Sequence, residues 1–123
     1  MIVEQSATTL EAGIDTLINS AKSDYVKRYG GDVNSDVAKK MIGQFSDGFV
    51  VKSGSKYVKI MCGNGGTPGG SCWGFVVKED TPKFKKGDIL KPAGWNKPAT
   101  NAARGNVLDG NYEIHWTGPV YLS

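Results

Sequence analysis

The density of turn-forming residues in the second half of this chain constrains its fold most. From Lys83 to Leu122, Gly, Pro and Asn recur at short intervals. Such spacing indicates short strands joined by tight turns, with aromatic and basic side chains on the loops. The first 48 residues are instead patterned as helices. The sequence therefore predicts a single domain over residues 1–123, with a helical part (1–48) and a β part with long loops (49–123).

Two helices are predicted in the first part. The first begins at a Thr8–Glu11 capping box and ends at Gly30, and the second begins after Ser35 and ends before Gly48. Apolar residues recur at steps of three and four, which predicts one core-facing stripe on each helix. These residues are Leu10, Ile14, Leu17, Ile18, Ala21, Tyr25 and Tyr29 in the first helix, and Val37, Ala38, Met41, Ile42 and Phe45 in the second.

Short strands are predicted in the second part, over residues 49–52, 56–61, 72–78, 87–91 and 112–116, and Val120–Leu122 can close the sheet. The connections are too short for parallel crossovers, so the sheet is expected to be mainly antiparallel. The predicted fold class is α+β: two N-terminal helices followed by a small sheet of about five strands. Such a sheet can curl into a partly open SH3-like or OB-like barrel. Residues 62–71 are glycine-rich and lie between two predicted strands, so a hairpin loop is expected there. A phosphate-binding P-loop is not indicated, because no Lys-Ser or Lys-Thr follows the glycines.

The sequence contains no recognisable catalytic constellation. Cys62 and Cys72 are expected to be reduced thiols, with a disulfide between them as the alternative, and nothing local marks either as an activated nucleophile. Together with His115 they would supply only three soft ligands, whereas structural zinc takes four, so neither a metal nor another cofactor is expected. Paired acid–base carboxylates are not indicated either. A protein without enzymatic activity is expected. The absence of an export signal and of a long apolar run predicts a cytoplasmic location without membrane association.

Basic charge gathers in the β part. Residues 52–104 carry ten basic and three acidic side chains, whereas residues 1–51 carry five basic and seven acidic ones. Such clustering favours a polyanionic partner, although lysines on an exposed sheet also keep a protein soluble. Aromatic residues among the cations suit either nucleic-acid binding or a protein-binding surface. The candidate binding residues are Lys83, Lys85, Lys86, Lys91, Trp95, Lys97 and Arg104.

Two functions from different classes remain open. The first is association with nucleic acid, and the second is a module that binds and modulates a host protein. Replacing Lys83, Lys85 and Lys86 by Ser is expected to abolish binding in the first case and to matter little in the second. A homo-oligomer formed through free strand edges is also compatible with the sequence.

One series of short motifs is shared with a known group of proteins. The motifs are Lys86–Lys91 (KGDILK), Trp95, Pro98–Ala99, Ala103–Asn106 (ARGN), Asp109–Gly110, Tyr112 and Trp116–Gly118 (WTG). In this series the chain resembles a family of small uncharacterised proteins of tailed phages, especially marine ones. The resemblance implies a phage origin and action in the host cytoplasm, and it transfers no catalytic residues.

Overall fold

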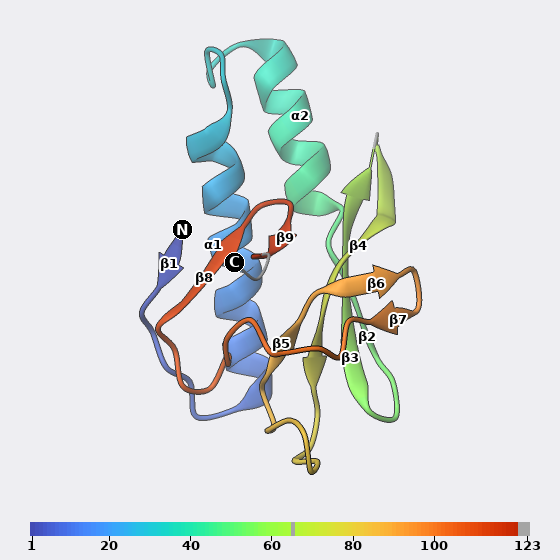
Figure 1. Ribbon diagram of the computed structural model, residues 1–123. Coiled ribbons are helices and arrows are strands. Elements are labelled where there is room, and N and C mark those ends of the chain that lie inside the picture. Colours follow the sequence, from blue (N-terminus) through green and yellow to red (C-terminus); the bar gives the residue numbers. More distant parts are fainter. Residues whose placement is uncertain (65, 121–123) are drawn as a thin grey trace.

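The computed structural model describes residues 1–64 and 66–120 (Figure 1). These residues form two helices and nine short strands. Tyr121 and Leu122, which were predicted to close the sheet, lie outside the described residues. The elements in chain order are β1 (Ile2–Val3), α1 (Leu10–Arg28), α2 (Asp36–Asp47), β2 (Val50–Ser53), β3 (Tyr57–Asn64), β4 (Thr67–Val77), β5 (Ile89–Leu90), β6 (Pro92–Gly94), β7 (Lys97–Pro98), β8 (Tyr112–His115) and β9 (Gly118–Pro119).

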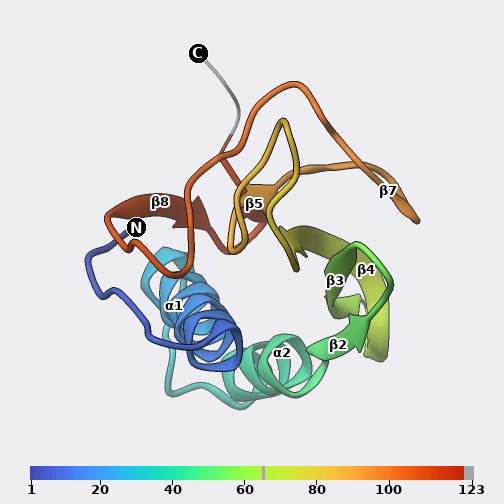
Figure 2. The same cartoon turned by 90° about the horizontal axis from the view of Figure 1, so that it is seen from below.

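The strands are divided among three antiparallel sheets. The largest has the order β2-β3-β4-β5, the second the order β1-β8-β9, and the third is the β6–β7 hairpin. Helices α1 and α2 lie next to each other and beside the four-stranded sheet (Figure 2). This arrangement confirms the α+β class. The strands of the described residues do not join into a closed barrel. Strand β1, which precedes the helices and pairs with β8, was not predicted.

Both helices begin at hydroxyl caps. The Thr9 side chain accepts a hydrogen bond from the Ala12 N–H at the start of α1, so the prediction that placed this cap at Thr8 is wrong by one residue. At the start of α2, the Ser35 hydroxyl accepts from the Ala38 N–H, as predicted. A capping side chain satisfies a backbone donor that has no partner within the helix.

The prediction for the buried face of α2 is wrong at two positions. Ala38 and Phe45 are buried, but Val37 is 68% exposed and Met41 is 44% exposed. The first turns of α2 extend beyond the end of the sheet (Figure 1). Apolar spacing identifies the stripe of a helix but does not say how far the partner surface reaches.

The glycine-rich segment is mostly strand rather than loop. Strand β3 continues to Asn64 and β4 begins at Thr67. A Cβ atom added at Gly63 would overlap the backbone carbonyl oxygen of Gln44 in α2. Glycine therefore allows this end of the hairpin to pack directly against the helix backbone.

The four-stranded sheet separates two clusters of buried side chains. The inner core lies between the sheet and the helices, with Leu17, Ile60 and Trp73 among its most buried members. Trp73 is therefore a core residue of the sheet. On the opposite face of the sheet, a smaller outer core joins Phe75, Val77, Phe84 and Leu90. Residues 79–88 and the segment around Ala103 cover this outer core. The sheet thus positions two layers of side chains at once.

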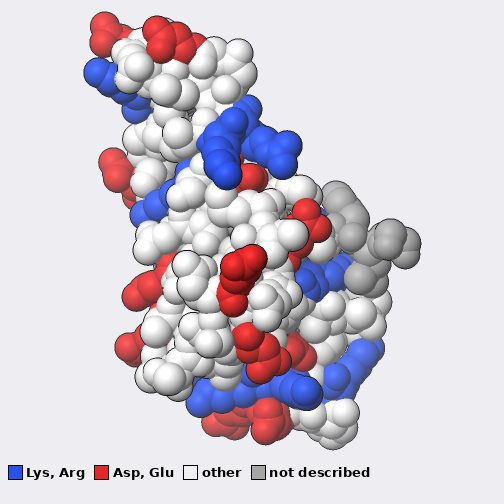
Figure 3. All heavy atoms as spheres, turned by 90° about the vertical axis from the view of Figure 1, so that its left-hand side faces the viewer, with Lys and Arg blue, Asp and Glu red and all other residues white. Residues whose placement is uncertain are grey.

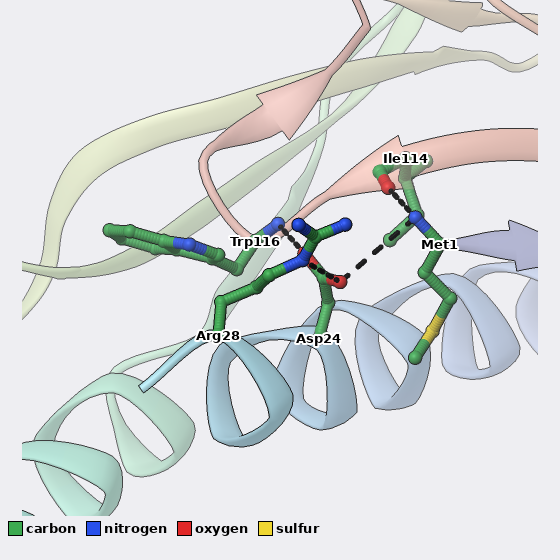
Figure 4. A network of polar contacts seen from close by, with 5 residues as sticks. All are labelled: Met1, Asp24, Arg28, Ile114 and Trp116. Carbon is green, nitrogen blue, oxygen red and sulfur yellow. Dashed lines mark hydrogen bonds and ion pairs between the residues drawn. The ribbon is translucent and has the colours of Figure 1, made fainter. Parts of the chain in front are cut away.

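A buried carboxylate joins α1 to β8 (Figure 4). Asp24 is 1% exposed, and its Oδ2 accepts the backbone N–H of Trp116 at 2.9 Å. Its Oδ1 lies 3.6 Å from Nε of Arg28 and 4.0 Å from the amino group of Met1. That amino group also donates to the Ile114 carbonyl oxygen at 2.8 Å. Because buried charges need partners, this network fixes the β1–β8 sheet on the helix.

Candidate nucleic-acid interface

The β2–β3 hairpin places two lysines opposite each other. The Gly54 N–H donates to the Tyr57 carbonyl oxygen at 2.8 Å, which closes the turn and pairs Lys52 with Lys59. Residues of β3 alternate, so that Val58 and Ile60 enter the inner core whereas Lys59 lies on the face that points away from the helices. We call that side of the sheet the outer face. Two like charges directly opposite each other on a sheet are destabilising without a counter-charge.

The β6–β7 hairpin adds an aromatic ring to these lysines. Its turn carries Trp95 and Asn96, and the Lys59 ammonium lies 3.7 Å from the centroid of the Trp95 ring. The same ammonium donates to Oδ1 of Asn96 at 2.8 Å. Trp95 still exposes 50% of its surface. The contact therefore fixes the position of the indole while leaving much of it open to solvent. We call Lys52, Lys59, Trp95 and Asn96 the outer-face patch.

The strands around this patch contain no acidic residue. Residues 48–78 and 89–108 contain neither Asp nor Glu, yet they carry seven cations. On the opposite side of the molecule, which carries α1, β1 and β8, acidic and basic atoms are interspersed (Figure 3). The excess of positive charge expected for residues 52–104 thus comes from the segments that build the four-stranded sheet and the β6–β7 hairpin.

The three lysines of residues 79–88 have a different setting. Lys83, Lys85 and Lys86 are exposed, but the same ten residues contain three carboxylates. Asp80 accepts the backbone N–H of Lys86 at 2.8 Å, and Asp88 accepts that of Lys85 at 2.9 Å. These carboxylates hold the loop in shape and balance its charge. The loop contributes no net charge to the molecule.

Lys91 and Arg104 lie close to each other, away from the outer-face patch. The Lys91 ammonium donates to the carbonyl oxygen of Pro119 at 2.9 Å, and Arg104 Nη1 donates to that of Ala102 at 2.9 Å. Burial, together with the charge of Arg104, lowers the pKa of Lys91. Because Lys91 faces β9 whereas Leu90 enters the outer core, the two cations lie on the side of the sheet opposite to Lys59.

The structure thus divides the predicted site residues among three places. Trp95 and Lys97 belong to the β6–β7 hairpin, Lys91 and Arg104 form a second group, and the lysines of residues 79–88 form a third. The predicted set does not include Lys52, Lys59 and Asn96 of the outer-face patch. The signal that could have found the lysines is the turn at Gly54–Tyr57, because a two-residue hairpin connection fixes the pairing of every residue that follows.

The two cysteines are free thiols on opposite faces of the sheet. Cys62 belongs to the inner core and Cys72 packs against the outer core. Burial raises the pKa of both thiols, and this outweighs the opposing effects of Ser71 on Cys62 and of the Lys59 charge on Cys72. A raised pKa disfavours the thiolate, which is the nucleophilic form.

Among residues 1–64 and 66–120 no group of three or more His, Cys, Asp or Glu side chains could hold a metal ion. Neither described helix is long and apolar enough to cross a membrane.

Comparison with known proteins identifies the family. The model of a family of unknown function, DUF7717, matches residues 3–121, and the chain belongs to this family. No curated protein and no solved structure matches the chain. Because the family has no known function, no activity follows from membership, and any function must be argued from the side chains.

Proposed function

We propose that this protein is a non-enzymatic module that associates with nucleic acid through the outer-face patch. One observation carries the proposal: a half-exposed Trp95 is held against Lys59, beside Lys52, on strands that contain no carboxylate. Exposed aromatic rings with neighbouring cations are the combination that proteins use to bind single-stranded nucleic acid.

Each member of the patch has a defined part in this association. A nucleobase stacks on the open surface of Trp95, which contributes about 1 to 3 kcal/mol per base. An ammonium has three N–H donors, and Asn96 uses one of those on Lys59, so the others can bind a phosphate oxygen. A phosphate near Lys52 and Lys59 also offsets the repulsion between these two paired lysines.

The test is fluorescence anisotropy with labelled single- and double-stranded DNA and RNA, at low and near-physiological salt. Trp95→Ala is expected to weaken binding of single strands by about 5- to 150-fold, which corresponds to the loss of one stacking interaction. Lys52→Ser together with Lys59→Ser is expected to reduce the slope of log affinity against log salt by about two, because two phosphate contacts are lost.

The control is the triple variant in which Lys83, Lys85 and Lys86 become Ser. These lysines are exposed but share their loop with three carboxylates, so a smaller loss of affinity per lysine is expected. Abolition of binding by the triple variant, with no effect of the Lys52 and Lys59 substitutions, would move the interface to residues 79–88. If the unaltered protein binds no nucleic acid at low salt, the proposal is wrong.

Two further parts of the proposal rest on the sequence. The resemblance to tailed-phage proteins supports a phage origin and action in the cytoplasm of the host cell. The second candidate function is a module that binds and modulates a host protein. The observation that favours it is an exposed edge of the four-stranded sheet at β2, beside an apolar groove.

A further inference from the structure

Strand β2 is an edge strand of the four-stranded sheet, with a neighbouring strand on one side only. The hydrogen bond between Gly54 and Tyr57 fixes which of its backbone groups point to that edge. In an antiparallel pair, hydrogen-bonded and non-hydrogen-bonded residue pairs alternate. Lys52 and Val50 therefore bond to β3, whereas Val51 and Ser53 direct their N–H and C=O groups outward. An outward row of this kind is a template for another strand.

A groove runs beside this edge on the inner side of the sheet. It has a volume of about 480 Å³ and lies between the first turns of α1 and strands β2 and β3. Its apolar wall consists of Leu10, Ile14, Val51 and Val58. Val51 is 46% exposed although its side chain points to the inner side. The backbone template and the apolar groove are thus adjacent, as in proteins that bind a peptide by adding it to a sheet.

We propose that the β2 edge binds an extended segment of a partner protein in which apolar and acidic residues alternate. In an added strand, every second side chain points to the inner side, where it would cover Val51 and enter the groove. The remaining side chains would lie on the outer face next to Lys52, which is paired with Lys59. Acidic side chains suit the outer positions, because residues 48–78 offer only positive charge there.

The opposite placement of the charges is disfavoured. Glu11 and Asp15 of α1 line the groove together with one cation, Lys78, so acidic side chains directed inward would meet a net negative charge. A second copy of this chain fits less well than a peptide for a related reason. Helix α1 flanks the edge in each copy, so pairing of two β2 strands would bring two acidic helix starts together. A single extended segment brings no second acidic helix to the edge, so this repulsion does not arise.

This inference rests on the second candidate function, binding of a host protein, and not on the nucleic-acid proposal, because it uses the edge of β2 rather than the Trp95 ring. The probe is a fluorescein-labelled seven-residue peptide of alternating Val and Glu. Two control peptides alternate Val with Lys, or have the same Val and Glu residues in separate blocks. Saturable binding is expected for the first peptide, with at least a ten-fold weaker affinity for both controls.

Amide hydrogen exchange locates the bound peptide. The amides of Val51 and Ser53 are expected to exchange rapidly in the free protein and to slow at least ten-fold on binding. Those of Val50 and Lys52 are expected to be protected already, because they bond to β3. Association through charge alone would leave the Val51 and Ser53 amides unchanged, and that result would overturn the proposal.

Two variants test the same contact. Val51→Pro removes an N–H that points out of the sheet, so the fold should be kept, as judged by circular dichroism, while peptide binding falls at least ten-fold. Val51→Thr keeps the N–H and should retain most of the affinity. Equal binding by both variants, or light scattering that shows a dimer closed by β2 in the absence of peptide, would refute the assignment. Loss of peptide binding with unchanged nucleic-acid affinity separates this inference from the proposed function.

Discussion

At the scale of single residues, Asp24 shows how one side chain connects distant parts of the chain. Its carboxylate is buried, yet it accepts a backbone N–H from a residue that is 92 positions later in the sequence. The ion pair with Arg28 adds little to stability, because the Arg28 side chain is 62% exposed and its charge is screened by solvent. The important partner is therefore the Trp116 backbone, whose N–H would otherwise be left without an acceptor.

Substitution of Asp24 tests this assignment. Asp24→Ala is expected to lower the free energy of unfolding by about 3 kcal/mol, because it leaves buried donors unpaired. Asp24→Asn keeps an oxygen that can accept the Trp116 N–H and should cost clearly less. Urea denaturation followed by circular dichroism measures both values. Equal losses for the two variants would mean that the charge, and not the hydrogen bond, carries the stabilisation.

Tyr112 provides a prediction for alkaline pH. Burial raises its pKa to about 12, and its hydroxyl has no hydrogen-bond partner among the described residues. The unfolded chain ionises near pH 10, so above that pH the unfolded state releases a proton that the folded state retains. The stabilisation is complete below pH 10 and is lost as the pH rises toward 12, by about 2 to 3 kcal/mol in total.

The comparison for this prediction is Tyr112→Phe. The variant should be at least as stable as the unaltered protein at pH 7, because it removes a buried hydroxyl without a partner. Its stability relative to the unaltered protein should then increase between pH 10 and 12, as measured by urea denaturation at each pH. A constant difference across that range would contradict the raised pKa.

At the scale of elements, the contact between α2 and the β3–β4 hairpin depends on glycine. A Cβ atom on Gly48 would overlap the backbone of Gly63, and one on Gly63 would overlap the carbonyl oxygen of Gln44. The hairpin end therefore approaches the helix more closely than side chains would permit. This contact joins the end of the β3–β4 hairpin, which contains the two longest strands, to the end of α2.

Alanine substitutions distinguish packing from backbone preference. Gly63→Ala is expected to destabilise the protein by about 1 to 3 kcal/mol, because its methyl group would overlap the Gln44 carbonyl oxygen. Gly43→Ala is the matched control, since it lies in the middle of α2 with no atom within 4 Å of the new Cβ. This variant should gain up to about 1 kcal/mol from helix propensity. Thermal denaturation of both proteins gives the comparison, and a tolerated Gly63→Ala would mean that the hairpin can shift away from α2.

At the scale of the whole molecule, both cores depend on the four-stranded sheet. The inner core joins it to the helices, and the outer core joins its opposite face to the covering loops. Loss of the sheet would therefore expose both clusters. We expect a single cooperative transition in urea, in which helical circular dichroism and the fluorescence of Trp73 and Trp116 change together. A Trp95→Phe variant removes the signal of the exposed indole, and two separated transitions would show that the helices unfold apart from the sheet.

Local patterns in the sequence were sufficient for the fold class and for most of the elements. The Ser35 cap, the apolar stripe of α1 and the alternation in β3 act between residues that are only a few positions apart, so the sequence shows them directly. The turn residues after Lys83 likewise predict short strands. The same local view assigned residues 62–71 to a loop, because it could not show that α2 provides a surface against which glycine can pack.

The sequence by itself determined two helices, a mainly antiparallel arrangement of short strands and a concentration of positive charge in the β part. Only the tertiary structure decided which cations meet an aromatic ring. Lys59 and Asn96 are 37 positions apart, and their contact depends on the pairing of β2 with β3 and on the placement of the β6–β7 hairpin. Helix caps and alternation arise from neighbouring residues, whereas register and contacts between strands arise from packing across the whole chain, which no local pattern records.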